Sequence, residues 1–435
     1  MDQTKDVMYQ WLILKRRIEG IFIFPFALLG RLIARFKPLP EEYDLFLFFP
    51  FYHVGGAEKV HSEIAQLFPE KKVIIFFTKK SMNDAMLPKF TGSNITIRNI
   101  STYTDNKYLY FNNLIWRGIT AAYISRQRNA PVVFNGQCNF AYKLSPHLPE
   151  GIRQVELIHS FCSFSYIRIP FIPFYTTTVM ISRDSIAEHI KLYKAYKIPK
   201  SYAEKIQLVM NGIPLPPMET TLLQSASLQP GETSLQSASM QPGETPLQSA
   251  PAASLQPTQA AHGEAMPRML YVGRGTAEKR PHLVARIAQQ ANTIAGFMGA
   301  VEDAIPTELR PYCHFYGEQT DAATIDAIYR EHQVIVITSS REGFPMVIME
   351  AMARGLAVLA TDVGDIPYHV KNGENGFLLD HTKKEKDLVS LAADLLEIWQ
   401  SDPSLLQTIA RNNIAYAQEH FGMRAFAEAY RKLLL

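Results

Sequence analysis

The sequence predicts an α/β protein made of two domains, each built on a doubly wound parallel sheet. At 435 residues the chain is longer than one ordinary domain. Short apolar runs alternate with helical patterns along residues 40–217 and again along residues 267–415, as they do in doubly wound sheets. A stretch of different composition, residues 218–266, separates the two. An arm at residues 1–39 and a helix at residues 416–435 complete the predicted organisation.

The composition is that of a soluble protein with a large core. Hydrophobic residues make up 47% of the chain and charged residues 20%. The net charge of +3 does not favour a nucleic acid as a partner. Three scattered cysteines, Cys138, Cys162 and Cys313, indicate a reducing compartment and free thiols, because their spacing matches neither a disulfide framework nor a zinc site.

The N-terminal arm is basic and partly apolar. Residues 1–37 carry seven Lys or Arg against three acids, a net charge of +4. The uncharged run at residues 20–30 is too short to span a bilayer, which needs roughly 20 apolar residues. No small-residue cleavage site follows it, as a signal peptide requires. We therefore expect residues 11–37 to lie in a membrane surface as a helix or hairpin, with their bases on anionic headgroups. An extra helix packed on the first domain is one alternative, and a signal or anchor segment is another.

In the first domain, the carboxyl ends of the strands carry the candidate site residues. Gly55 and Gly56 lie between the first strand and a helix, where backbone N–H groups can approach a ligand closely. His159 follows a later strand, at the edge where a ligand cleft is expected, although a purely structural histidine is the alternative. The aromatic segment 161–175 faces an acceptor, faces a membrane, or packs internally. Strands are expected at residues 45–49, 72–77, 95–98, 131–134, 155–158, 177–181 and 206–210, with helices after residue 56, over 114–126 and over 184–195.

Residues 218–266 contain a 12-residue repeat, which begins at Leu223 and again at Leu235. Ser, Gln, Ala, Pro and Thr dominate, and there is little to bury. This composition predicts a disordered linker without a catalytic role.

In the second domain, a basic cluster surrounds a predicted helix start. Arg274, Lys279 and Arg280 precede the helix that opens at Pro281. Cations oppose the dipole at a helix N-terminus, so the cluster is better explained if it holds an anion such as a diphosphate. A solvated basic surface is the alternative. Strands are expected at residues 269–272, 313–316, 334–337 and 358–361, with helices over 282–290, 321–329 and 346–354.

The most informative stretch is residues 334–355, which predicts a buried strand, a polar loop and a helix that ends at Gly355. Glu342 lies in the loop and Glu350 in the helix, where their carboxylates can grip sugar and ribose hydroxyls. The spacing alone is weak, and the alternative is two solvated glutamates. Three backbone N–H groups can hold an anion between them, those of Phe344, Met346 and Val347.

Together these motifs resemble those of the family-four retaining glycosyltransferases with the GT-B fold. Glu342 and Glu350 match the Glu-x7-Glu signature of that family. Gly-Gly-Ala-Glu at residues 55–58 resembles its first loop, and Gly-Arg followed by Glu278-Lys279 resembles its diphosphate clamp. The likeness runs from residue 44 to residue 435 except for the insert. It implies two Rossmann-like domains facing a cleft, with the last helix returning to the first domain.

The resemblance also assigns roles, without a metal or a cofactor. It implies that Glu342, His159, Arg274 and Lys279 are catalytic. Three positions depart from the family pattern: relatives often have an acid in place of Ser160, a glycine in place of Asp365 and an acid in place of Tyr368. The donor-binding residues that it implies are Gly55, Gly56, Arg274, Lys279, Gly317, Gly343, Phe344, Pro345, Met346, Val347 and Glu350.

The implied function is the metal-independent transfer of a hexose, with retention, from a UDP- or GDP-linked donor to a glycan or lipid-linked acceptor. This places the protein in polysaccharide, lipopolysaccharide or glycolipid biosynthesis, in the cytoplasm and peripherally on the cytoplasmic face of a membrane. Two other classes stay open. One is a GT-B sugar-nucleotide epimerase or hydrolase, and the other is a catalytically silent nucleotide-sugar-binding subunit. The intact clamp and both glutamates argue against the silent subunit.

Overall fold

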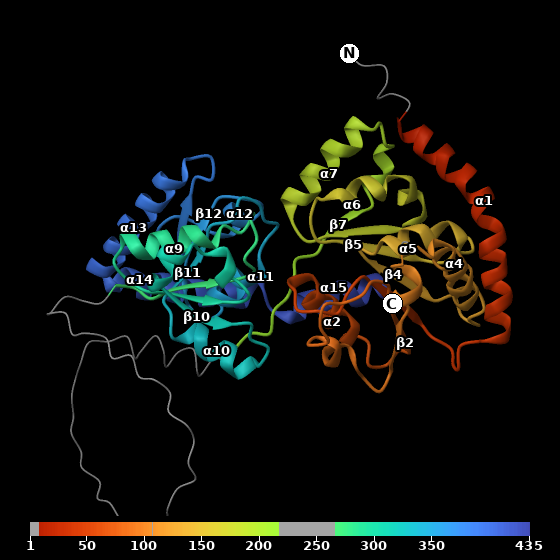
Figure 1. Ribbon diagram of the computed structural model, residues 1–435, viewed down its shortest axis with the longest axis horizontal. Coiled ribbons are helices and arrows are strands. Elements are labelled where there is room, and N and C mark those ends of the chain that lie inside the picture. Colours follow the sequence, from red (N-terminus) through yellow and green to blue (C-terminus); the bar gives the residue numbers. More distant parts are fainter. Residues whose placement is uncertain (1–7, 107, 217–265) are drawn as a thin grey trace, which may run out of the picture.

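A computed structural model describes residues 8–106, 108–216 and 266–435. Within these ranges the predicted fold class is confirmed, with two parallel sheets in two domains that stand side by side (Figure 1). The first sheet has seven strands in the order β3-β2-β1-β4-β5-β6-β7, and the second has six in the order β10-β9-β8-β11-β12-β13. The predicted linker at 218–266 lies, apart from Met266, outside the described residues.

The first domain follows the predicted alternation of strands and helices. The central strands are buried along their whole length, which explains why they are continuous apolar runs. Its strands are β1 (Leu45–Phe49), β2 (Val73–Phe77), β3 (Ile95–Asn99), β4 (Val132–Gly136), β5 (Gln154–Ile158), β6 (Thr177–Met180) and β7 (Ile206–Leu208), and its helices are α1 (Met8–Phe36), α2 (Gly56–Gln66), α3 (Ser101–Thr104), α4 (Tyr110–Ser125), α5 (Asn139–Leu144), α6 (Ser163–Ile167) and α7 (Arg183–Ala195).

The second domain contains two strands that the sequence patterns did not predict, β9 and β13, because both are short and include a glycine, which weakens the apolar signal. Its strands are β8 (Met269–Val272), β9 (Ala295–Met298), β10 (Cys313–Gly317), β11 (Val334–Ile337), β12 (Ala357–Thr361) and β13 (Gly376–Leu379), and its helices are α9 (Pro281–Gln290), α10 (Ala322–Arg330), α11 (Met346–Met352), α12 (Ile366–His369), α13 (Glu385–Ser401), α14 (Pro403–His420) and α15 (Met423–Leu434).

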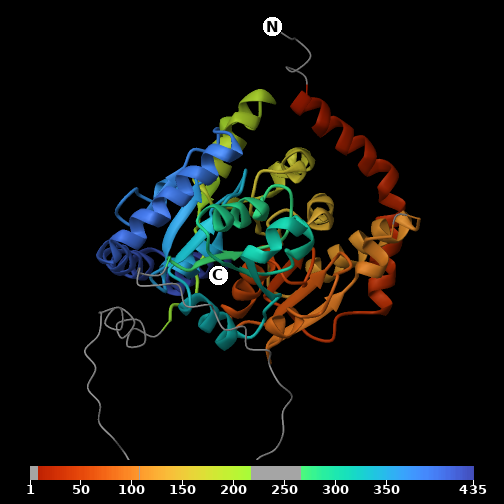
Figure 2. The same cartoon turned by 60° about the vertical axis from the view of Figure 1, so that its left-hand side comes forward.

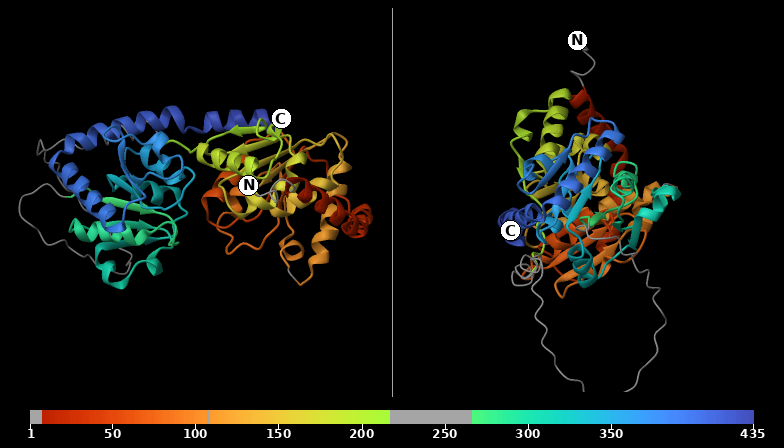
Figure 3. Two further views of the ribbon diagram at one scale, coloured as in Figure 1. Left: turned by 90° about the horizontal axis from the view of Figure 1, so that it is seen from above. Right: turned by 90° about the vertical axis from the view of Figure 1, so that its left-hand side faces the viewer.

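Two successive helices carry the chain back from the second domain to the first. Seen from above, α14 and α15 run along one side of the molecule across both domains (Figure 3). α15 buries Phe426, Tyr430 and Leu434. The ring centroid of Tyr430 lies 6.1 Å from that of Phe134 in β4, and Arg431 donates to a carboxylate oxygen of Glu70 at 2.6 Å. The last helix therefore belongs to the core of the first domain.

Helix α1 packs along the first domain on the side away from the second (Figures 1 and 2). It meets α4 at two glycines, since Gly30 lies against the backbone of Ile115 and Gly118 lies against the backbone of Ala27. Its start packs near η4 (Ile169–Phe174), where Arg16 donates to the carbonyl oxygen of Pro170 at 2.7 Å. Within the described residues, no helix is long and apolar enough to cross a membrane.

Candidate functional site

The two domains touch through several specific contacts around the loop that carries Glu342. The carboxylate of Asp365 accepts hydrogen bonds from the backbone N–H groups of Arg183 and Asp184, at 2.6 and 2.7 Å. These are the first two residues of α7, so a carboxylate of the second domain closes the N-terminus of a helix in the first. A Cβ added to Gly343 would lie 3.5 Å from the carbonyl oxygen of His159. The structure thus brings the Glu342 loop beside the carboxyl end of β5.

Glu342 is held by a lysine of the predicted clamp. Lys279 Nζ lies 2.5 Å from Glu342 Oε1, and Ser339 Oγ donates to the same oxygen at 2.6 Å. The Glu342 side chain is only 9% exposed, which strengthens its attraction to the ammonium group. The predicted sugar-binding acid and the predicted diphosphate-binding base therefore form an ion pair with one another.

Glu350 is held in the same way by a lysine that the sequence analysis did not single out. Lys59 of α2 reaches across from the first domain and forms an ion pair with Glu350 Oε1. Tyr329 donates its hydroxyl to Glu350 Oε2 at 2.9 Å. Lys59 directly follows the Gly-Gly-Ala-Glu motif, which ends at Glu58, and this position was the only hint in the sequence that it could be functional. No local pattern indicates that its partner lies 291 residues away.

Arg274 of the second domain acts electrostatically on Glu58, in the first turn of α2. Glu58 is 8% exposed, and burial raises the pKa of its carboxyl, while its own backbone N–H, His53 and Arg274 act in the opposite direction. Arg274 is therefore close enough to act on a carboxylate of the other domain. A Cβ added to Gly55 would lie 2.1 Å from Glu58 Oε2, so a larger residue there would displace the Glu58 side chain. Gly56 begins α2, and no described atom lies within 4 Å of a Cβ placed there.

His159 has a second histidine as its neighbour. Its Nε2 atom lies 2.9 Å from Nε2 of His61, and its backbone N–H donates to Gln137 Oε1 at 3.1 Å. Burial lowers the pKa of His159 to about 4. The pKa of His61 is also well below its usual value, mainly because the ring is buried and to a smaller extent because His159 lies beside it. Both rings are therefore neutral near pH 7.

Other predicted site residues are placed differently. The side chains of Phe344 and Met346 are buried in the core, where the ring centroid of Phe344 lies 4.2 Å from that of His369. Pro345 precedes α11 and Val347 is partly buried, so this segment can meet a ligand mainly through backbone groups. Gly317 ends β10, an edge strand, with a φ of 67°.

Arg280, the third base of the cluster, has a structural role. Its backbone is left-handed, with a φ of 47°, and its guanidinium Nε donates to the carbonyl oxygen of Thr338 at 2.7 Å. It therefore ties the start of α9 to the loop that precedes Glu342.

One group of side chains among the described residues has the spacing of a cation site. Ligand atoms of Asp362, Asp380 and His381 lie within 4.8 Å of one another. His381 Nδ1 and Asp362 Oδ1 are already 2.7 Å apart, and Asp380 accepts from the hydroxyl of Thr382 at 2.6 Å. Each of these three side chains therefore already has a hydrogen-bond partner within the chain.

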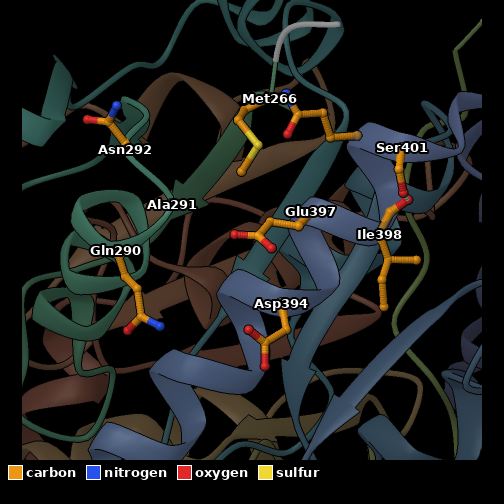
Figure 4. A pocket seen from close by; sticks show the side chains of 9 residues that line it. Met266, Gln290, Ala291, Asn292, Asp394, Glu397, Ile398 and Ser401 are labelled. Atoms are coloured by element: carbon orange, nitrogen blue, oxygen red, sulfur yellow. Dashed lines mark hydrogen bonds between the residues drawn. The ribbon is translucent and has the colours of Figure 1, made fainter. Parts of the chain in front are cut away.

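A large open pocket lies elsewhere in the second domain. It has a volume of about 810 Å³ and is lined by residues around the end of α9 and along α13. Figure 4 shows the carboxylates of Asp394 and Glu397 at its wall. None of the predicted site residues lines this pocket, so the candidate site remains the contact between the domains.

Comparison with known proteins finds one family model that matches the second domain. Residues 256–414 match the sequence model of the family described as "Glycosyl transferases group 1". This match covers nearly all of the second domain. Arg274, Lys279, Glu342 and Glu350 all lie within the matched range.

Curated relatives match over short segments. A segment of 54 residues is 43% identical to a D-inositol 3-phosphate glycosyltransferase of Corynebacterium glutamicum, and covers 12% of this chain and 13% of that relative. A segment of 107 residues is 34% identical to the protein of the same name from Corynebacterium diphtheriae, over 25% of this chain and 23% of the relative. The matched segments thus span less than a quarter of either relative.

Solved structures match over nearly the whole chain. HepE of Anabaena, solved in complex with UDP-glucose, has a TM-score of 0.62 at 16% identity, over 90% of this chain and 99% of that one. WaaG, described as a glycosyltransferase involved in lipopolysaccharide biosynthesis, has a TM-score of 0.60 at 13% identity, over 89% and 99%. The likeness shows the fold, and it confirms the expected GT-B arrangement of two domains.

Proposed function

We propose that the protein transfers a hexose from a nucleotide-diphosphate sugar, UDP- or GDP-linked, to a glycan or lipid-linked acceptor, with retention of configuration. The observation that carries this proposal is the ion pair between Lys279 and Glu342 at the domain contact. Lys279 is suited to bind a diphosphate and Glu342 is suited to bind sugar hydroxyls, and the ion pair places these two side chains in direct contact. The carbonyl oxygen of His159, in the first domain, lies beside the Glu342 loop.

The proposed reaction exchanges these internal partners for the donor. The diphosphate replaces Glu342 as the partner of Lys279 and also engages Arg274, while Glu342 and Glu350 become acceptors for hydroxyls of the sugar and the ribose. An acceptor oxygen then forms a bond to the anomeric carbon on the face from which the diphosphate departs. The bond from that carbon to the diphosphate oxygen breaks, and the acceptor's proton passes to the leaving diphosphate. Arg274 and Lys279 stabilise the charge that develops there, without a resident metal. Contacts such as that of Asp365 with α7 keep the domains closed and water out.

Replacing Lys279 by alanine tests the role of the clamp. Loss of one electrostatic stabiliser of a transition state lowers turnover by about 10²- to 10³-fold. Lys383 is exposed in the same domain, so Lys383→Ala is a matched control that we expect to keep full activity. Donors are first found by a thermal-shift panel of UDP- and GDP-sugars, because a ligand that binds the folded state raises its melting temperature. Normal turnover of a folded Lys279→Ala variant would refute the assignment. Release of free sugar or an epimer without acceptor would instead show one of the two alternative enzymes.

We also propose that α1 holds the enzyme on an anionic membrane, where a lipid-linked acceptor would be found. The residues of α1 that face the first domain recur with heptad spacing, and Tyr9, Ala27, Gly30 and Ala34 among them are buried. A second stripe of apolar residues, one or two positions away from the buried ones in the sequence, faces solvent. Its large apolar members are Trp11, Leu14, Ile18, Ile21, Phe22, Leu28, Leu29, Leu32 and Phe36, each at least 44% exposed.

The surroundings of this stripe favour a lipid surface over another occupant. α1 carries five bases and one acid, which complement anionic headgroups. The exposed patch continues onto the start of α4, since the ring of Phe111, itself 60% exposed, stacks on Phe26 with centroids 5.1 Å apart. Leu109 beside it is 55% exposed. A long helix with one face packed and the other apolar and basic can lie in the plane of a membrane.

Vesicle sedimentation tests this proposal. The full chain is expected to bind vesicles of phosphatidylglycerol and phosphatidylethanolamine, and to bind pure phosphatidylcholine weakly. Ile21→Gln with Phe22→Gln removes two side chains that are 70% and 73% exposed, and should lower binding at least about tenfold. Leu391→Gln with Ile398→Gln, which changes two exposed apolar residues of α13, is the matched control. Equal vesicle binding by the two double variants would contradict membrane docking through α1.

A further inference from the structure

A pair of histidines lies where the proposed donor sugar meets the first domain. His61 comes from α2, and His159 follows β5. Their Nε2 atoms are 2.9 Å apart, so one ring must donate a hydrogen to the other. The sequence analysis singled out only His159, and the proposed function leaves His61 without a role.

The His61 ring is held rigidly in place. It is 1% exposed and stacks on Phe49 of β1, with ring centroids 4.3 Å apart and an interplanar angle of 15°. Gly136 at the end of β4 lies beside both rings, since an added Cβ there would come within 2.6 Å of His61 Nε2 and of the Phe49 ring. A buried ring that is stacked on Phe49 and bounded by the Gly136 backbone is held beside His159.

The unpaired nitrogen of His61 indicates which ring donates. His61 Nδ1 is buried and has no hydrogen-bond partner among the described residues. A buried N–H without an acceptor is rarer in proteins than a buried acceptor without a donor. The proton of His61 is therefore placed on Nε2, where it is bonded, and not on Nδ1. His159 Nε2 is then the acceptor, and the proton of His159 lies on Nδ1.

We propose that His61 is a positioning residue that fixes His159 in the Nδ1–H tautomer, so that His159 offers a hydrogen-bond donor to a hydroxyl of the donor sugar. The tautomer follows from the geometry, whereas the role toward the sugar rests on the proposed function. With Nε2 occupied and the ring neutral near pH 7, His159 orients the sugar and does not act as a general base.

The tautomer is measured on the full chain labelled with ¹⁵N-histidine, by long-range correlation of ring protons with ring nitrogens near pH 7. Signals of His159 are assigned by their loss in His159→Gln. We expect a protonated Nδ1 and a bare Nε2 for His159, and the reverse for His61. His189 and His332 are internal references, because their Nδ1 atoms lie 2.7 and 2.6 Å from the carbonyl oxygens of Ser185 and Ile328, which can only accept. A protonated Nε2 on His159 in the wild type would overturn the proposal without any reference to activity.

Two variants then connect the tautomer to the reaction. In His61→Leu the donor is lost, so His159 should become a mixture of tautomers and kcat/KM should fall about two- to fivefold, in proportion to the competent fraction. His61→Gln retains an N–H donor and should restore both the ring signals and kcat/KM. An unchanged His159 tautomer in a folded His61→Leu variant would overturn the positioning role. If the tautomers behave as expected while no sugar nucleotide is used, the proposed function fails and the pairing stands.

Discussion

Replacing Gly118 of α4 by alanine should loosen the docking of α1. The added Cβ would lie 2.0 Å from the carbonyl oxygen of Ala27, whereas carbon and oxygen normally approach to about 3.3 Å. The obstacle is backbone, so no rotamer change relieves it and the helices must move apart by more than about 1 Å. Overpacking of this kind costs up to about 3 kcal/mol. Alanine regains about 1 kcal/mol of helix propensity. The net loss is about 2 kcal/mol.

Hydrogen–deuterium exchange of α1 measures this loss directly. If α1 opens locally, 2 kcal/mol corresponds to about thirtyfold faster exchange of the amides in residues 8–36. Gly20→Ala is the matched control, because no described atom lies within 4 Å of a Cβ at that position of the same helix. This control should slow exchange slightly. Exchange in Gly118→Ala that is as slow as in Gly20→Ala would refute the close packing of α1 on α4.

Three further predictions concern the core, the domain contact and pH. Glu156→Gln leaves the buried Arg168 without its countercharge and should cost about 3–5 kcal/mol in thermal or urea unfolding, whereas the exposed Glu204→Gln should cost little. Asp365→Ala removes both acceptors at the start of α7, so small-angle scattering should show a larger radius of gyration than for Asp380→Ala; equal radii would contradict a closing role. Acidification from pH 6.5 toward 4 should lower the unfolding free energy by up to about 1.4 kcal/mol per pH unit for each histidine whose folded pKa is depressed, because the unfolded chain binds more protons in this window. A flat profile between pH 7 and 5 would contradict the burial of these rings. Burial lowers the pKa of each to about 4: His147, His159, His189 and His369.

Much of the architecture was readable from local patterns. Apolar runs bounded by turn residues predicted the strands, because a strand buried on both faces needs little else from its sequence. The positions of Gly55, Lys279 and Glu342 after strands placed them toward one cleft, since parallel strands present their carboxyl ends at the same edge. Gly355 was expected to stop a helix, and it has a φ of 78° just after α11.

The pairings within the site depend on how distant segments pack. Lys59 meets Glu350 across 291 residues and His61 meets His159 across 98, and no local periodicity specifies such partners. Asp365 stood out in the sequence only as a departure from a family pattern, and its function as an acceptor for α7 required both domains in place. α1 shows the same division. Its apolar, basic composition was visible in the chain, but only the close approach of Gly30 and Gly118 determines which stripe is buried and which faces solvent. Periodicity is a property of neighbouring residues, whereas packing partners are selected by sheet order and domain contact.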